Sequence, residues 1–239
     1  MKSTLLLYRL HLRTMVTKAR LVGLFAVGLA ALGLGLALRF TNHPETRAER
    51  VYTHLITTFG LNLIVPVTAL VFASAAFGDP TDDKTMVYLW LTPVPRWRLV
   101  ASALAASLTI AVPVAVLPLA AATILAGSTS RVVMATSVGA AFATVAYTAV
   151  FLGLGLRVRR ALAWGLAYLL IWELAVARAA KGAAKLSISV YSRSLLARIA
   201  DHLAPRNGTS LLAALIVPPI VIVAALVLTT WWLARAEVA

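Results

Sequence analysis

Residues 21–38 read LVGLFAVGLAALGLGLAL, a run of apolar residues and glycine with no charged, hydroxyl or amide side chain. A helix needs about 20 such residues to cross the hydrocarbon core of a bilayer. In lipid the backbone must satisfy its own hydrogen bonds, and a helix does so. The run therefore predicts a membrane-spanning helix.

Five further stretches have the same character, so the predicted fold class is an all-α integral membrane protein with six transmembrane helices. We treat residues 1–239 as a single transmembrane domain. Within it, the predicted spans are 21–38, 55–77, 99–126, 132–156, 161–177 and 211–233.

The composition agrees with a membrane protein. Of the 239 residues, 61% are hydrophobic, and the mean hydropathy is +0.90. Soluble domains have roughly 45–50% apolar residues, and one soluble core of this size cannot bury such an excess. The net charge of +14 comes from basic residues in short segments between the apolar runs. At such positions they orient a membrane protein, so we expect no nucleic-acid partner.

Lysine and arginine in short loops mark the cytoplasmic side of a membrane protein. The turn between the fourth and fifth predicted spans contains Arg157, Arg159 and Arg160, whereas the turn before the fourth contains only Arg131. With six spans, the basic N-terminal segment lies on the same side as the arginine-rich turn. The sequence therefore predicts cytoplasmic termini in the inner membrane, and the Ala-, Val- and Arg-rich composition is typical of a bacterium.

Residues 1–20 precede the first span and combine basic with apolar side chains. We read them as a retained, amphipathic interfacial helix rather than a cleaved signal peptide. The alternative is a basic flank that only anchors the first span. The apolar residues that gather on one predicted face are Leu5, Leu6, Tyr8, Leu12, Met15 and Val16.

The loop between the second and third spans is the most informative segment. Residues 77–100 read FGDPTDDKTMVYLWLTPVPRWRLV. They predict a short cytoplasmic helix over 79–92, with Asp79 or Thr81 as its N-cap and acidic residues in its first turn. The alternative is an ordinary capped loop. The apolar face at helical spacing would consist of Met86, Leu89 and Trp90.

This loop resembles that of the permease subunits of type-2 ABC exporters. In that family an acidic residue, a basic residue and a threonine follow the second span, and a Pro-Val-x-Arg element leads into the third. The chain departs from the family at Lys84, where a glycine is common, and at Ala101 and Ser102, near which a lysine is common. The matching positions here are Asp82 or Asp83, Lys84, Thr85, Leu89, Leu91, Pro93, Val94, Pro95 and Arg96.

The resemblance implies a transport subunit and not an enzyme. It implies two copies of a separate ATPase, which bind ATP and magnesium, and a second permease subunit, identical or different. The chain has no phosphate-binding loop of its own, so we expect no cofactor in it. The resemblance also implies that the loop helix docks into the ATPase, through Asp82, Asp83, Lys84, Thr85, Met86, Leu89 and Trp90.

An exporter of this family would move an amphipathic or hydrophobic substrate along a path lined by the first, second and fifth spans. Serine and threonine in spans often bond only to their own backbone, which is the alternative for the polar residues here. The candidates for the substrate pathway are Thr57, Thr58, Asn62, Thr68 and Ser74.

Glu173 is the only acidic residue within a predicted span, and an ionisable group there is costly. It has three readings: a neutralising contact with Arg178 or Lys181, substrate or proton handling, or a misplaced fifth span. The following segment, 179–210, predicts re-entrant or interfacial helices on the outer side, with an ordinary amphipathic surface helix as the alternative.

Two other functions are open from the sequence: a stand-alone ion-coupled transporter and a membrane-embedded lipid-modifying enzyme. The first needs buried charge, which only Glu173 offers. The second needs clustered acids, histidines or a nucleophile with a base. The four histidines lie in separate segments without the spacing of metal ligands, so we expect no metal site.

Overall fold

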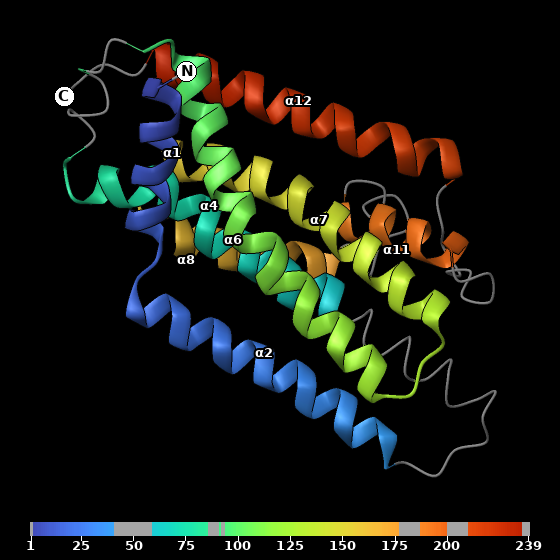
Figure 1. Ribbon diagram of the computed structural model, residues 1–239. Coiled ribbons are helices and arrows are strands. Elements are labelled where there is room, and N and C mark those ends of the chain that lie inside the picture. Colours follow the sequence, from blue (N-terminus) through green and yellow to red (C-terminus); the bar gives the residue numbers. More distant parts are fainter. Residues whose placement is uncertain are drawn as a thin grey trace.

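The computed structural model describes residues 2–40, 59–85, 91, 94–176, 187–199 and 210–235, and every regular element within these ranges is a helix (Figure 1). Two elements, η1 and η2, are π-helical, with wider turns than an α-helix. The elements are α1 (Lys2–Met15), α2 (Lys18–Arg39), η1 (Gly60–Ile64), α4 (Val65–Asp82), α6 (Arg96–Leu125), α7 (Ser130–Arg157), α8 (Ala161–Tyr168), η2 (Leu169–Val176), α11 (Ile188–Ile199) and α12 (Leu211–Arg235).

The all-helical membrane fold is confirmed, but the count of six spans is not. Five helices of the described chain are long and apolar enough to cross a bilayer, namely Lys18–Arg39, Gly60–Asp82, Arg96–Leu125, Ser130–Arg157 and Leu212–Arg235. The predicted fifth span corresponds to α8 and η2, and its apolar part, Ala161–Glu173, falls short of that length.

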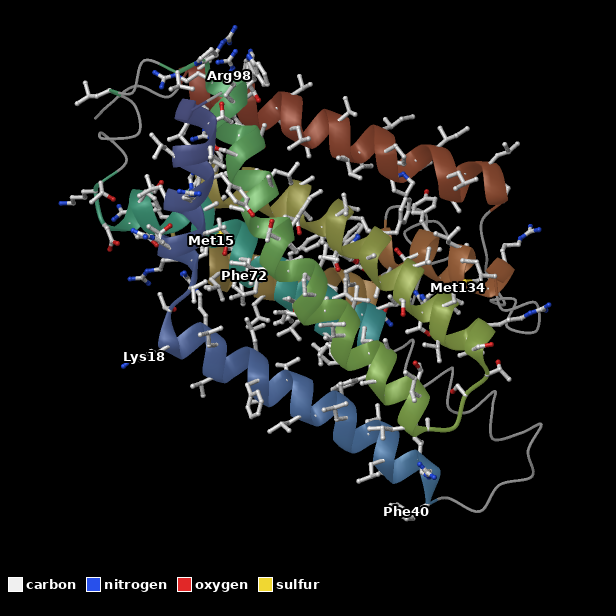
Figure 2. All side chains as sticks on the ribbon, in the orientation of Figure 1. Met15, Lys18, Phe40, Phe72, Arg98 and Met134 are labelled. Atoms are coloured by element: carbon white, nitrogen blue, oxygen red, sulfur yellow. The ribbon has the colours of Figure 1, made fainter. Side chains whose placement is uncertain are left out.

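Two helices form the centre of the bundle. In the most apolar stretch of Gly60–Asp82, 83% of the residues are buried inside the protein, and in that of Ser130–Arg157, 67% are buried. The corresponding shares are only 22% in Lys18–Arg39 and 17% in Leu212–Arg235. The outer helices α2 and α12 project large apolar side chains away from the protein (Figure 2), among them Phe25 and Val227. Such side chains are stable only against lipid, so α2 and α12 present the lipid-facing surface.

Glycines bring the central helices close together. A methyl group added at Gly155 of α7 would lie 2.6 Å from the backbone oxygen of Ser74 in α4, and one added at Gly35 of α2 would lie 2.5 Å from the oxygen of Ala122 in α6. Small residues allow such backbone contact between membrane helices. A methyl group added at Gly33, in contrast, would have no atom within 4 Å. Gly35, and not Gly33, therefore makes the close contact with Ala122 of α6.

Basic side chains gather at the end of the bundle where α2 begins and α12 ends, near Lys18 and Arg98 (Figure 2). Helix α1 runs across the direction of α2 at this same end (Figure 1). The residues of this end with a basic side chain include Arg9, Arg13, Lys18, Arg20, Lys84, Arg96, Arg98, Arg157, Arg159, Arg160 and Arg235.

The contact between α4 and α7 gives a direct test of the packing. We expect Gly155→Ala to destabilise the purified protein by about 1–3 kcal/mol, because the backbone of Ser74 cannot move aside without separating the two central helices. Gly33→Ala is the matched control and should be neutral or slightly stabilising, since alanine favours the helix. Thermal unfolding in detergent measures both, and equal melting temperatures for the two variants would contradict the packing.

Candidate functional site

Helix α1 is held on the bundle by one face. Leu7, His11 and Met15, spaced four residues apart, are buried against α6 and α4. The Tyr8 hydroxyl lies 3.0 Å from that of Thr109 in α6. The apolar face predicted from the sequence is wrong in part, because Leu5, Leu6 and Val16 are exposed. Apolar residues therefore lie on two sides of α1, as expected for a helix between the bundle and the membrane surface.

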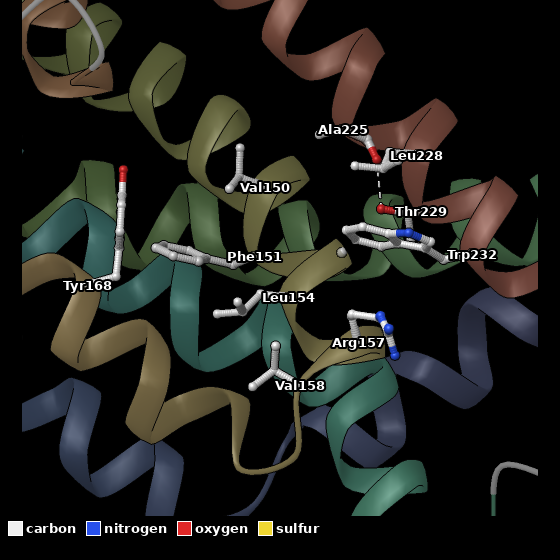
Figure 3. Close-up of a pocket in the computed structure, with 11 residues that line it drawn as sticks. Val150, Phe151, Leu154, Arg157, Val158, Tyr168, Ala225, Leu228, Thr229 and Trp232 are labelled. Carbon is white, nitrogen blue, oxygen red and sulfur yellow. Dashed lines mark hydrogen bonds between the residues drawn. The ribbon is translucent and has the colours of Figure 1, made fainter. Parts of the chain in front are cut away.

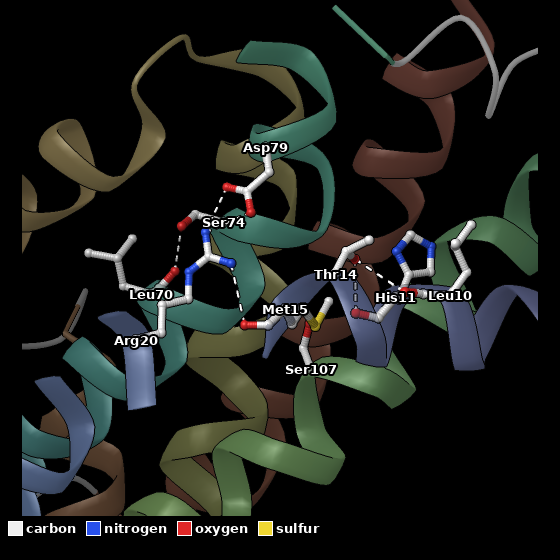
Figure 4. Close-up of polar contacts among 9 residues, drawn as sticks. All are labelled: Leu10, His11, Thr14, Met15, Arg20, Leu70, Ser74, Asp79 and Ser107. Carbon is white, nitrogen blue, oxygen red and sulfur yellow. Dashed lines mark hydrogen bonds and ion pairs between the residues drawn. The ribbon is translucent and has the colours of Figure 1, made fainter. Parts of the chain in front are cut away.

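Only two residues, Val16 and Thr17, separate α1 from α2, and an ion pair fixes this junction. Nη2 of Arg20 lies 2.7 and 2.6 Å from the two carboxylate oxygens of Asp79, near the end of α4 (Figure 4). Nη1 of Arg20 also donates to the backbone oxygen of Met15 at 3.4 Å. The side chains of Arg20 and Asp79 are 16% and 38% exposed. The pair thus joins the α1–α2 junction to the base of the loop that follows α4.

The start of the predicted loop helix is wrong. Asp79 and Thr81 cap no new helix, because α4 continues without interruption to Asp82. The Thr81 hydroxyl donates back to Phe77 O at 2.7 Å, which satisfies it within the helix. Pro80 lies in this last turn of α4, where its ring nitrogen has no N–H to donate to the preceding turn.

The end of α4 is a Schellman turn, in which two amide groups close the helix. Lys84 N donates to Thr81 O at 3.3 Å, and Thr85 N donates to Pro80 O at 2.8 Å. Lys84 has the left-handed conformation, with φ 57°, which glycine adopts at lower cost. A glycine would therefore adopt this turn with less backbone strain than the lysine that the chain has at position 84.

Of the predicted docking residues, Asp82 ends α4 and Asp83, Lys84 and Thr85 follow it, and all four are exposed. Their side chains are therefore accessible at the basic end of the bundle. Met86, Leu89 and Trp90 lie outside the described residues.

Three of the five predicted pathway residues lie inside the bundle. Thr57 and Thr58 are outside the described residues. Asn62 in η1 and Thr68 in α4 are buried without a hydrogen-bond partner among the described atoms. Ser74 is buried too and donates to Leu70 O at 2.6 Å, the backbone bond that was the alternative reading. In this arrangement none of the three lies on the outer surface.

Glu173 in η2 is the centre of a buried cluster of hydroxyl groups. Its side chain is 1% exposed. Oε1 accepts from the Tyr147 hydroxyl of α7 at 2.6 Å, while Oε2 accepts from Ser187 at 2.5 Å and from Ser189 at 3.0 Å. Arg193 also reaches this cluster, with Nη2 3.4 Å from Ser189 Oγ. Three donors thus replace the water that a membrane-buried carboxylate lacks.

The sequence did not reveal these partners. Arg178 and Lys181, which were expected to neutralise Glu173, lie outside the described residues. Tyr147 is 26 positions away from Glu173 in the sequence. The one sequence feature that could have pointed to it is its place in the middle of a span, since tyrosine is more common at the ends of spans. Ser187 and Ser189 were hidden in the outer segment, where serine is unremarkable.

His11 is a second buried ionisable group, on α1. Its ring meets Phe77 edge to face, with 6.0 Å between centroids, and its Nε2 has no partner among the described atoms. Burial lowers the pKa of His11 from 6.5 to about 4, because the charged ring cannot be solvated. His11 is therefore neutral at pH 7. No group of three metal-binding side chains occurs in the described part of the chain.

We expect Tyr147→Phe to destabilise the protein by about 1–3 kcal/mol, because it removes a donor to a buried carboxylate while leaving the ring stacked on Phe151. Tyr168→Phe is the matched control, since the Tyr168 hydroxyl makes no hydrogen bond to a described residue, and should cost much less. In a Glu173→Ala background the effect of Tyr147→Phe should shrink. An unchanged effect in that background, measured by thermal unfolding, would refute the cluster.

His11 predicts a specific loss of stability in acid. Between pH 6.5 and about 4 the unfolded chain binds a proton at His11 that the folded protein does not, so stability falls as the pH falls. The contribution is about 2 kcal/mol between pH 7.5 and pH 5. His11→Leu should therefore lose less stability over this range than the wild type. Leu7→Ala, a neighbouring change without a titrating group, should shift the curve equally at both pH values.

Comparison with known proteins assigns the chain to a family. The model of one family, described as ABC-2 family transporter protein, matches residues 15–177, more than half of the chain and including α2, α4, α6 and α7. No curated protein and no solved structure matches it. The match covers the α1–α2 junction, the end of α4 and the Glu173 helix. The chain thus belongs to the ABC-2 family, as a membrane transport subunit that associates with ABC ATPases.

Proposed function

We propose that this chain is the permease subunit of an ABC exporter, which moves an amphipathic or hydrophobic substrate out of the cytoplasm with energy from a separate ATPase. One observation carries the proposal beyond the family: the central helix α4 runs unbroken from the buried core to Asp82, and the exposed residues 83–85 follow it directly. A displacement of that exposed end is transmitted directly to the centre of the bundle.

The loop after α4, including Asp82, Asp83, Lys84, Thr85, Met86, Leu89 and Trp90, would be the surface that the ATPase holds. α4 is rigid here because most of its side chains are buried and its last turn is closed by the Schellman turn. The Arg20–Asp79 ion pair links the same point to α1 and α2. Movement of the loop would therefore displace a peripheral span together with the central one.

The distribution of charge supports the orientation. The basic side chains of α1, of the α7–α8 turn and of the last turn of α12 lie at one end of the bundle. Cytoplasmic loops carry such an excess, so this end, with both termini, would face the cytoplasm. Because α8 and η2 follow α7 back into the bundle, they would be the fifth of six spans.

The helix α11 lies at the opposite end and packs on α7 and α12. In the proposed orientation it would be the outer helix before the last span, bound to the bundle by the Glu173 cluster. The transport path would form between this chain and a second permease subunit, powered by two ATPase copies. The buried polar residues Asn62 and Thr68 would reach the substrate only when α4 moves.

The Glu173 cluster bears on the rival functions. A carboxylate that carries ions or protons needs access and an exchangeable partner, whereas Glu173 is enclosed and accepts three hydroxyl hydrogen bonds. This arrangement favours an anchoring role over ion coupling. The lipid-modifying enzyme would need clustered acids or histidines to hold a metal, and among the described residues no group of three such side chains occurs.

Co-purification with the ATPase encoded nearest to the gene tests the proposal. The tagged chain and the ATPase would be co-expressed and isolated in mild detergent. We expect the wild type to retain the ATPase and a Leu89→Asp, Trp90→Asp double variant to lose it, because two carboxylates would replace the apolar face of the loop.

The matched control introduces two carboxylates at the opposite end of the bundle, by Thr129→Asp and Ser130→Asp in the exposed turn before α7. This variant should retain the ATPase as well as the wild type does. Equal loss of the ATPase in both variants would show a general effect of charge. Failure of the folded wild type to retain any ATPase would overturn the proposed function.

A further inference from the structure

An apolar groove opens between α7, α8 and α12 (Figure 3). It has a volume of about 310 Å³, which is within the range of small-molecule sites. Val150, Phe151 and Leu154 of α7 form one wall, and Ala225 and Leu228 of α12 face them. The hydroxyl of Thr229 is directed into its own helix, where it donates to Ala225 O at 2.7 Å.

A single charged side chain, Arg157, lines the groove, at the end where α7 terminates (Figure 3). Arg157 is exposed, and no acid or hydrogen-bond acceptor among the described residues contacts it. Trp232 lines the same end. Tryptophan and arginine at the end of an apolar surface mark the level of the lipid headgroups.

The surroundings of this end are strongly basic. Arg159 and Arg160 come after Arg157 with only Val158 between, and Arg235 ends α12 with its guanidinium 4.2 Å from the centre of the Trp231 ring. No acidic residue occurs in α7, in α8 or in α12. A second copy of the chain placed on this face would bring like charges together, so the charge favours an anionic occupant with an apolar tail.

We propose that this groove binds an anionic phospholipid from the leaflet facing Arg157, with an acyl chain along the apolar wall and the phosphate on the guanidinium. Arginine binds phosphate oxygens with two parallel hydrogen bonds. The acyl chain would cover the apolar side chains that line the groove. The lipid would then join α7 to the peripheral α12, the two helices between which the groove opens.

Native mass spectrometry of the full-length chain in mild detergent tests this site, without an ATPase and so independently of the proposed function. The probes are phosphatidylglycerol and phosphatidylcholine with identical acyl chains. We expect one phosphatidylglycerol to bind more tightly than phosphatidylcholine. Arg157→Ala should weaken phosphatidylglycerol binding about fivefold and leave phosphatidylcholine unchanged.

Two further variants locate the site. Ala225→Trp should weaken both lipids, because the indole fills the groove. Arg159→Ala is the matched control, since it removes the same charge from the same turn but does not line the groove, and it should retain the wild-type affinity. Equal loss in Arg157→Ala and Arg159→Ala would show diffuse attraction to a basic surface and overturn the proposal. Unchanged binding in a folded Ala225→Trp variant would do so too.

Discussion

The structure depends on one constraint: within lipid, a backbone or side-chain polar group that finds no partner in the protein costs free energy. Helices meet this demand for the backbone, and the hydroxyls of Ser74, Ser107 and Thr144 meet it by donating to the preceding turn. Glu173 cannot do so alone, because a carboxylate has several acceptor sites and no donor. Its three donors come from α7 and from the segment of α11, so one acidic residue determines how three elements assemble.

The same constraint divides the bundle into a core and a periphery. α4 and α7 pack backbone to backbone at Gly155 and Ser74, which excludes lipid and makes them behave as one body. α12 packs on α7 and α2 packs on α6, each with a narrow face, and both expose the rest of their surface to lipid. A force applied at the end of α4 therefore moves a compact unit, while the Arg20–Asp79 pair determines whether α2 follows. The ion pair lies at the end of the bundle, where partial exposure lowers the cost of desolvating both charges.

Sequence reasoning located five of the six predicted spans, because long apolar runs have few alternatives to a membrane helix. It failed where the outcome depended on tertiary contacts. Asp79 has the pattern of an N-cap, yet Arg20, 59 positions earlier, holds it in the last turn of α4. The partners of Glu173 could not be predicted either, since nothing in the sequence shows which serine or tyrosine lies near Glu173 in the folded protein. The predicted fifth span has a shorter apolar helix than the others, and its π-helical turns give no sign in the sequence.

The π-helical segments show how the bundle accommodates these demands. A π-helix has one more residue per turn than the regular pattern allows, and this widens the helix and turns a side chain to a new direction. η2 contains Glu173, and η1, which contacts η2, α7 and α11, contains Asn62. Both distortions therefore occur beside the polar interior, and neither occurs in the lipid-facing helices α2 and α12. η1 and η2 thus each place one buried polar side chain, Asn62 and Glu173, in the interior of the bundle.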